Sequence, residues 1–317
     1  MKYQLFAYRT DTATPATGLR VNDQAYDLRG VATSAQVELA VLAIDGLLED
    51  WARANEQLQA LAEGIINNPA GFDEHRLDLD ALELATPLQR PGTIYAAGAN
   101  YRDHVAAMGR AFNMKLSLDP RSDGIAPWHF IKAGRGSLAA HKQIVEMPEG
   151  TKKLDWEAEL AVVIGRRAYR VSKDKALDYV AGYTCANDLS ARDSLVRDAV
   201  DASSPFRFDW IGHKVFNGAC PLGPYLTPAQ FVQDPEALDI KLWRNGTIEQ
   251  DSNTSNHMYG VADQIEYLSQ RVELFPGDVI LTGTPAGVGM EKGVFLARGD
   301  VLKVWIEGLG ELETIIA

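Results

Sequence analysis

Apolar and polar residues alternate in short runs at the start of the chain and then change to helical spacing. Residues 2–10 and 18–30 carry strand-like runs around Asn22–Asp23, which predicts two short paired strands joined by a turn. From about residue 35 to 67 the apolar residues recur at helical spacing, which predicts two helices or one helix broken at Gly46.

The pattern changes after Pro91–Gly92, where strand-like runs dominate. The runs are TIYAAGAN, HFIKAG, WEAELAVVIG, YVAGYTCAND, LDIKLWRNG, DVILTGT and DVLKVWIEGLGELETII. Asn245–Gly246 predicts a hairpin with a type I′ turn, and residues 259–272 predict a helix. Because strands do not alternate regularly with helices, we expect an α+β fold with a mixed or antiparallel sheet. We place a domain boundary between residues 1–88, with strands and helices, and a β-rich domain, residues 89–317.

Residues 105–130 differ from the rest of the chain. They mix glycine, proline, charged and aromatic residues, and they link two strand-like runs. A long irregular connection in a compact domain is often a lid or a binding loop, and the alternative is an exposed insertion without function. The sequence favours neither.

The strand-like run KLDWEAELAVVIG, residues 153–165, carries an acidic residue at every second position. Side chains of a strand alternate between faces, so Asp155, Glu157 and Glu159 are expected to point the same way. Like charges on one face repel, and buried carboxylates are costly unless they are paired or bind a metal. A solvated face is one alternative, but the apolar LAVVIG that follows favours burial. Ligation by oxygen alone favours Mg²⁺, Mn²⁺ or Ca²⁺ over zinc.

A cation site of this kind needs a further ligand, and Asp188 is a candidate. The run YVAGYTCAND ends at Asn187–Asp188, and a carboxylate at the end of a strand can point into a cavity. Asn–Asp pairs mostly serve as turns or helix caps, and the following LSARD also suits a helix N-cap. The three interpretations stay open at this point.

The composition narrows the class of protein. The chain has 317 residues, 46% of them hydrophobic, and a formal net charge of −12. An acidic protein is a poor candidate for binding nucleic acid or an anionic membrane surface, so we expect neither partner. Cys185 and Cys220 form neither a metal-ligand spacing nor a disulfide framework. With no apolar run of signal-peptide or membrane-spanning length, we expect a reduced, cytoplasmic protein.

Five motifs follow one another in the second part of the chain: GANYRDH, DWEAELAVVIG, GYTCANDLSARD, GHKVFNGACPLGP and PGDVILTGTPAGVG. Together they resemble the fumarylacetoacetate hydrolase family over roughly residues 90–317, and residues 1–85 resemble its variable N-terminal segment. The resemblance implies a β-rich mixed β-sandwich roll, assembled as a homodimer. It also implies an Mg²⁺ or Mn²⁺ ion held by Glu157, Glu159 and Asp188.

The resemblance implies a catalytic role for His104, which aligns with a histidine that deprotonates water. Many family members place a glutamate three residues later, and this chain has Ala107 there. Such an acid orients and polarises the imidazole. If another acid replaces it, we expect Asp119 or Asp123, which lie in the 105–130 segment. Asp155 matches no ligand of the family, so we expect it outside the ligand set.

Further side chains are assigned by the same resemblance. Lys214 aligns with a lysine near the site that can neutralise an enolate or a carboxylate. Substrate contacts are implied for four residues: Tyr101, Lys132, Arg192 and Thr284. Arginine suits a substrate carboxylate because its guanidinium fork matches that group. Where some relatives have a substrate-binding glutamine, this chain has Leu195, which makes the pocket more apolar.

These features predict a metal-dependent hydrolase that cleaves a C–C bond in a β-diketo or acylpyruvate-type 2-oxo acid, in the catabolism of aromatic compounds. Ala107 keeps a second prediction open, in which the same metal site decarboxylates oxaloacetate or a related β-keto acid, or catalyses isomerisation or hydration. A third alternative is a carboxylate-binding protein without catalysis. The joint presence of His104, Lys214 and the three acids argues against it. The expected partner is a small 2-oxo carboxylate substrate.

Overall fold

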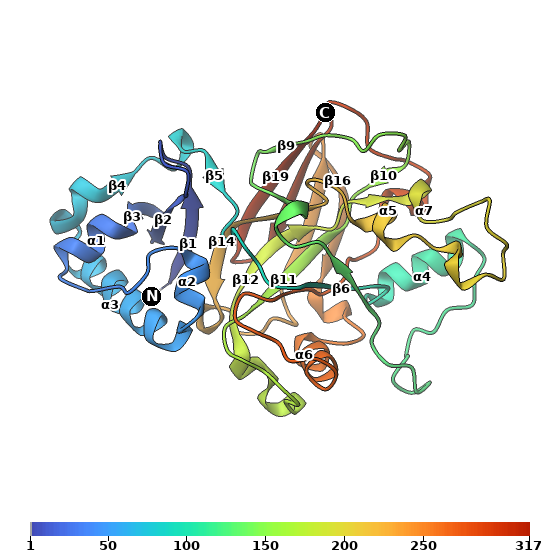
Figure 1. Cartoon of the computed structure of the whole chain (residues 1–317), viewed down its shortest axis with the longest axis horizontal. Helices are drawn as coiled ribbons and strands as arrows, with labels where there is room; N and C mark the ends of the chain where they lie inside the picture. Colours follow the sequence, from blue (N-terminus) through green and yellow to red (C-terminus); the bar gives the residue numbers. More distant parts are fainter. Residues whose placement is uncertain (1) are drawn as a thin grey trace.

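The computed structural model describes residues 2–317, and a twelve-stranded sheet runs through both parts of the chain (Figure 1). Its main path follows the spatial order β4 (Arg76–Leu77), β3 (Gln24–Asp27), β2 (Ala16–Val21), β1 (Tyr3–Tyr8), β14 (Cys220–Pro228), β12 (Val180–Asn187), β11 (Ala158–Ile164), β17 (Val279–Leu281), β6 (Ile94–Ala97) and β7 (His129–Lys132). Off this path, β5 (Leu84–Ala85) pairs with β1 and β8 (Leu138–Ala139) pairs with β14.

Two smaller sheets complete the β-structure. One pairs β10 (Leu154–Asp155) with β13 (Ser190–Ala191). The other has the order β16 (Thr247–Asn253), β15 (Asp239–Arg244), β18 (Val301–Ile306), β19 (Gly310–Ile316) and β9 (Ile144–Val145). Parallel pairs (β6 with β17, β8 with β14, β9 with β19) occur among antiparallel ones. The chain is therefore a mixed α/β protein with several sheets, and its finer description as a sandwich roll stays a prediction.

The helices are α1 (Leu28–Ser34), α2 (Ile44–Leu48), α3 (Trp51–Asn67), α4 (Arg102–Ala111), α5 (Trp210–Lys214), α6 (Val261–Ser269) and α7 (Gly289–Lys292). The helix predicted over 259–272 is confirmed as α6. The prediction for 35–67 is partly wrong, because residues 35–43 are not helical and the helix break falls after Leu48, not at Gly46. Helix α1 begins at Leu28, before the predicted helical region. The Asp27 carboxylate caps the start of this helix by accepting the Gly30 N–H at 2.8 Å.

The N-terminal part packs onto the rest through its first strand. The predicted turn is confirmed at Asn22 (φ 48°) and Asp23 (φ 65°), which join β2 and β3. Strand β1 pairs with β14, and one hydrophobic core includes Leu5 of β1, Leu61 of α3 and Leu226 of β14. Strands from both parts thus share a sheet and a core, and the boundary at residue 88 stays a prediction.

Strand β11 lies in the middle of this sheet, between β12 and β17, and all its residues are buried. Its side chains alternate as a strand requires. Leu160, Val162 and Ile164 belong to one hydrophobic core, while Ala161 and Val163 belong to another. Glu159 shares the face of Ala161 and Val163, so the fold places this carboxylate inside the protein and not in solvent.

The 105–130 segment is helical in its first part, which the sequence did not indicate. Helix α4 continues to Ala111, and the chain is then largely irregular until β7 begins at His129. His104 lies in the first turn of α4 and is buried. The irregular remainder carries exposed apolar side chains, among them Met114 and Ile125.

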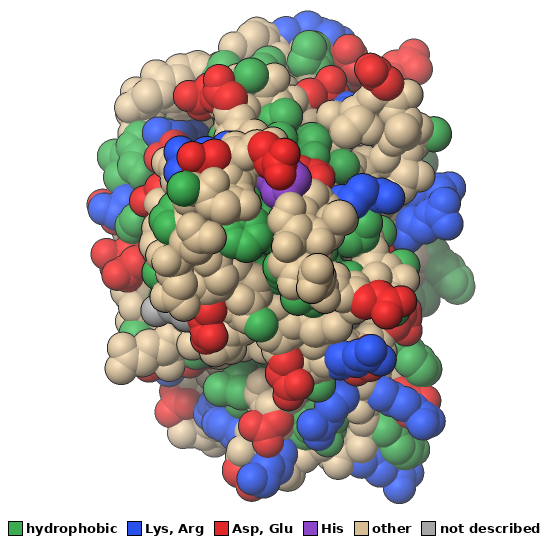
Figure 2. All heavy atoms as spheres, turned by 90° about the vertical axis from the view of Figure 1, so that its left-hand side faces the viewer, with side chains coloured by type: hydrophobic (Ala, Val, Ile, Leu, Met, Phe, Trp, Pro, Cys, Tyr) green, Lys and Arg blue, Asp and Glu red, His purple; other side chains and the backbone are tan. Residues whose placement is uncertain are grey.

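Figure 2 shows acidic and basic side chains interspersed over the face that the N-terminal part forms. Within residues 2–317, none of the helices has the length and apolar character needed to cross a bilayer. Cys185 and Cys220 are both buried and free.

Candidate metal centre

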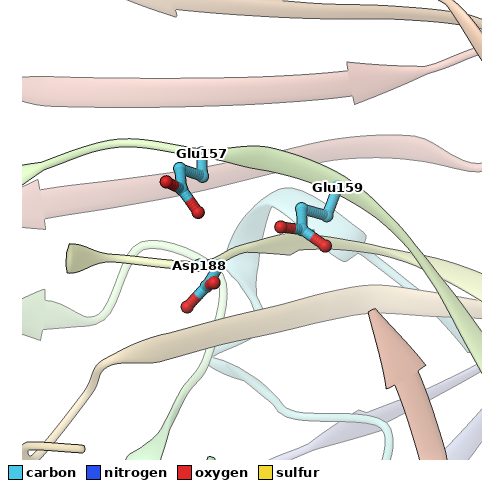
Figure 3. A group of neighbouring side chains, drawn as sticks. All are labelled: Glu157, Glu159 and Asp188. Atoms are coloured by element: carbon cyan, nitrogen blue, oxygen red, sulfur yellow. The ribbon is translucent and has the colours of Figure 1, made fainter. Parts of the chain in front are cut away.

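Three carboxylates converge inside the β-rich part of the chain. Glu157 lies between β10 and β11, Glu159 lies on β11, and Asp188 directly follows β12 (Figure 3). One oxygen from each residue lies within 4.8 Å of the others, and all three residues are buried. Strands β11 and β12 are antiparallel neighbours, with Ala158 opposite Asn187. This pairing brings the two glutamates on either side of Ala158 close to Asp188, which follows Asn187. The structure thus places the three predicted ligands in one cluster.

Two of the three acids have basic partners. The Lys214 ammonium donates to Glu157 at 2.7 Å and to Asp188 at 2.5 Å. Lys132 donates to the other oxygen of Asp188, and Arg192 donates to the other oxygen of Glu157. Burial alone raises the pKa of Glu157, but Lys214 and Arg192 outweigh it and hold that pKa below its usual range.

Glu159 differs because its carboxylate has no basic partner among residues 2–317. Its Oε2 accepts the Gly283 N–H at 2.7 Å, and its buried Oε1 has no hydrogen-bond donor. Burial raises the pKa of Glu159 well above its usual range, and Asp188 and Glu157 add to the shift. An orphaned buried carboxylate oxygen beside two further carboxylates is the donor set that a hard divalent cation takes. The residues present therefore fit Mg²⁺ or Mn²⁺.

Asp155 does not point toward the other acids, although the strand alternation predicts the same face. The strand is interrupted after Asp155, which belongs to the small β10–β13 sheet, while β11 starts at Ala158. The Asp155 carboxylate lies against Arg192 and the start of α7. The group of acids close enough to share a metal ion consists of Glu157, Glu159 and Asp188, and the expectation that Asp155 lies outside the ligand set stays a prediction.

His104 forms a buried pair with Glu291, which the sequence did not indicate. The His104 Nδ1 and Glu291 Oε1 are 2.6 Å apart, and each side chain is only 9% exposed. The expectation that Asp119 or Asp123 replaces the acid missing at Ala107 is wrong, because they contact Ser122 and Ser117 instead. Both serines lie in the same exposed loop, and a local Asp–Ser hydrogen bond is available there without any reach toward α4.

The remaining predicted side chains have different surroundings in the structure. Tyr101 is fully buried, and its hydroxyl has no partner within residues 2–317. The Thr284 hydroxyl accepts from Gln250 Nε2 at 2.9 Å, while Gln250 Oε1 accepts the Ala158 N–H at 2.9 Å. Gln250 thus links the Thr284 loop to β11, a role that a lone glutamine in a sequence does not reveal. Arg192 donates to two protein carboxylates, so its contact with substrate stays a proposal.

His213 is a buried histidine next to Lys214, and its burial makes the stability of the folded protein depend on pH. Burial, and then Lys214, lowers the pKa of His213 to about 3, and the ring nitrogen Nδ1 donates to the Ala191 carbonyl at 2.9 Å. Below about pH 6.5 the unfolded chain binds a proton there that the native protein does not bind. Stability should therefore fall with decreasing pH between about 6.5 and 3, by roughly 1.4 kcal/mol per pH unit from this group. Urea unfolding at pH 7 and pH 5 should show a smaller loss for His213→Asn than for the wild type, and an equal loss would contradict the assignment.

Comparison with known proteins identifies the family. The family model described as fumarylacetoacetate (FAA) hydrolase C-terminal matches residues 93–317. The chain is 37% identical over 226 residues to oxaloacetate tautomerase Fahd2a, mitochondrial, of Rattus norvegicus, which covers 71% of this chain and 66% of that protein. It is 38% identical over 227 residues to a 2,4-didehydro-3-deoxy-L-rhamnonate hydrolase of Sphingomonas sp. (strain SKA58), covering 71% of this chain and 73% of that protein.

A solved structure agrees with these matches. The crystal structure of maleylpyruvate hydrolase from Sphingobium sp. SYK-6, in complex with manganese(II) ion and pyruvate, has a TM-score of 0.70 and 25% identity to this chain. The match covers 99% of this chain and 98% of that one. With the family model spanning most of the chain, the protein belongs to the fumarylacetoacetate hydrolase family.

Proposed function

We propose that this chain is a divalent-metal-dependent hydrolase that cleaves a C–C bond of an acylpyruvate-type 2-oxo acid. The observation that carries the proposal is the buried His104–Glu291 pair near Glu157 of the acid cluster, with His104 Nδ1 and Glu291 Oε1 2.6 Å apart. Hydrolysis needs a base that activates water, and a carboxylate that orients the histidine is the usual arrangement. Ala107 keeps decarboxylation open because the acid beside His104 is missing there, and Glu291 supplies such an acid.

The proposed cofactor is Mg²⁺ or Mn²⁺, held by Glu157, Glu159 and Asp188. When bound, such an ion supplies Lewis-acid polarisation of the 2-oxo carboxylate. The formal charges support this assignment, because four carboxylates (Asp155, Glu157, Glu159 and Asp188) face only three basic side chains (Lys132, Arg192 and Lys214). A divalent cation turns this residual negative charge into a positive one, which suits an anionic substrate.

In the proposed reaction, His104 takes a proton from water while the water oxygen bonds to the distal carbonyl carbon of the substrate. The bond between that carbon and the pyruvate part then breaks, and its electron pair stays on the pyruvate part as an enolate, which takes up a proton. Lys214 uses two N–H donors on Glu157 and Asp188, so one remains for the enolate oxygen. The products are one carboxylic acid and one pyruvate.

A panel of three substrates tests the proposal. Mn²⁺-loaded protein is given acetylpyruvate, benzoylpyruvate and oxaloacetate, and pyruvate, carboxylic acid and carbon dioxide are measured. We expect the acylpyruvates to yield acid and pyruvate in equal amounts, with kcat/KM above that for any reaction of oxaloacetate. A higher kcat/KM for carbon dioxide release would favour decarboxylation instead.

A second candidate function is tautomerisation of oxaloacetate. It is favoured by the rat relative, which carries that name and is 37% identical. A base such as His104 can equally move a proton between the carbon and the oxygen of an enol. Enol loss followed by ultraviolet absorbance in the same panel separates the two candidates, since tautomerisation releases no second product.

An aromatic cluster beside the lysines supports a substrate with an apolar distal group. The Phe130 ring lies 5.0 Å from the Lys214 Nζ and stacks on Trp210 at 5.4 Å, and Trp128 lies 4.9 Å from Trp210. Phe130 is two residues before Lys132 on β7, and Trp210 is four residues before Lys214 on α5. Each element thus carries a lysine into the acid cluster and an aromatic ring just outside it.

Trp210→Ala tests this part of the proposal. We expect kcat/KM for benzoylpyruvate to fall about tenfold, because the distal ring loses its aromatic contact, and that for acetylpyruvate to change little. Tyr169→Ala is the control, since this aromatic ring is 54% exposed and lies against Arg170. Equal losses for both substrates would contradict a distal binding wall.

The proposal includes a homodimer and a cytoplasmic location. Sedimentation velocity measures the assembly directly.

A further inference from the structure

Asp155 is a buried carboxylate that the proposed reaction does not use. It is fully buried, and each of its two oxygens accepts two hydrogen bonds. Oδ1 accepts from the backbone N–H groups of Trp156 at 2.9 Å and Gly289 at 2.6 Å. Oδ2 accepts from Met290 N–H at 3.1 Å and from Arg192 Nε at 2.9 Å. Every lone pair of this side chain is therefore committed to a specific partner.

The hydrogen bonds from the Gly289 and Met290 N–H groups hold the start of α7 against Asp155. The residue before this four-residue helix is Val288, whose side chain cannot accept a hydrogen bond, so Asp155 caps the helix from 134 residues away. The approach is close, because a Cβ at Gly289 would lie 2.8 Å from Asp155 Oδ1. Helix α7 carries Glu291, whose Oε1 lies on His104 and whose Oε2 accepts the Gly287 N–H at 2.8 Å.

The hydrogen bond from Arg192 Nε to Asp155 Oδ2 holds the Arg192 side chain. Asp155 holds the guanidinium through Nε, and the Nη2 of the same group donates to Glu157. Because the guanidinium is planar and rigid, holding one edge determines where the other lies. Asp155 thus contacts both Arg192, which donates to Glu157, and helix α7, which carries the partner of His104.

We propose that Asp155 is a positioning residue that couples the two halves of the site. It holds α7 so that Glu291 reaches His104, and it holds Arg192 so that the guanidinium lies on Glu157. The consequence for catalysis rests on the proposed function, whereas the consequence for the geometry does not.

Asp155→Asn tests the proposal with little change of shape. An asparagine presents one oxygen and one NH₂ group. Because both oxygens of Asp155 accept from N–H groups, the NH₂ of the asparagine would face donors and lose the hydrogen bonds on its side. We expect Mn²⁺ affinity to fall about tenfold and kcat to fall about ten- to a hundredfold, as for residues that orient ligands and bases from the second layer. The ring-proton NMR signal of His104 reports the contact without turnover. In the wild type, a proton shared by His104 and Glu291 should resonate far downfield, and in Asp155→Asn it should shift or vanish.

A double mutant separates positioning from a loss of stability alone. In a Glu291→Gln background the His104 contact is already lost, so at saturating Mn²⁺ adding Asp155→Asn should lower kcat by less than about threefold. Asp278→Asn is the matched control, because Asp278 is also buried and accepts two backbone N–H groups, from Thr93 and Phe275. It should lower stability, leave the His104 signal in place and not change Mn²⁺ affinity.

If Asp155→Asn does not fold, Met290→Pro replaces it. Proline removes the Met290 N–H, is tolerated in the first turn of a helix, and replaces a side chain that is 38% exposed. It should shift the His104 signal and leave Mn²⁺ affinity unchanged. The proposal is overturned if the folded variant keeps the wild-type His104 signal, or if the kcat losses of Asp155→Asn and Glu291→Gln multiply. A shifted signal in a protein that cleaves no acylpyruvate would overturn only the proposed function.

Discussion

Glu159→Gln is expected to abolish tight binding of divalent cations and, at the same time, to leave the metal-free protein as stable as the wild type or more so. Glu159 has a buried oxygen without a donor, and burial penalises its charge. Removing that charge relieves the penalty and removes a metal ligand. We expect Mn²⁺ affinity to fall by roughly a hundredfold or more, given that even outer-layer changes cost ten- to a hundredfold.

The opposite stability effect is expected for Glu157→Gln, which serves as the matched variant. Glu157 is paired with Lys214 and Arg192, so its loss leaves two buried cations without a full partner. This variant should lose Mn²⁺ affinity and also several kcal/mol of stability, about 3–5 by analogy with broken buried ion pairs. Titration calorimetry with MnCl₂ and thermal unfolding in excess EDTA measure both quantities. Normal Mn²⁺ binding by Glu159→Gln, or equal destabilisation of the two variants, would contradict the assignment of the cluster.

Glu291→Gln is expected to lower kcat by about 10²–10⁴-fold with little change in KM. A carboxylate on Nδ1 fixes the orientation of the imidazole and stabilises its protonated form, and a neutral amide does neither well. The expectation follows from the 2.6 Å contact with His104. Steady-state kinetics with an acylpyruvate measure it.

The control for this variant uses the acids that the sequence had suggested. Asp119→Asn and Asp123→Asn should leave kcat unchanged, because both side chains contact serines of an exposed loop. Activity retained in Glu291→Gln but lost in Asp119→Asn would return the role to that loop.

The acid cluster was predictable because it depends on local rules. The period of two along a strand predicts Glu157 and Glu159 on one side, and the run of apolar residues after them indicates burial. The structure brings the two carboxylates together, although Glu157 lies just before β11. The direction of Asp155 was not predictable, because the pleat is interrupted between β10 and β11 and the side chain turns toward α7. An alternation argument assumes a continuous strand, and no residue type near Trp156 signals the interruption.

The partner of His104 was not predictable for a different reason. His104 and Glu291 are 187 positions apart and meet through tertiary packing of α4 on α7, which no sequence spacing encodes. Asp119 and Asp123, the replacement acids expected from the sequence, are near Ala107 in the chain but contact serines of their own loop in the fold. A similar limit applies to α1, whose start depends on the Asp27 cap, a local signal that the apolar period does not include.

Product stoichiometry with and without metal tests the central claim most directly. The protein is stripped with EDTA, divided, and one half is reloaded with Mn²⁺; acetylpyruvate is then added to both. The proposed function predicts equal amounts of acetate and pyruvate from the reloaded half and almost none from the stripped half. Undiminished turnover in excess chelator, or release of one product without the other, would contradict it.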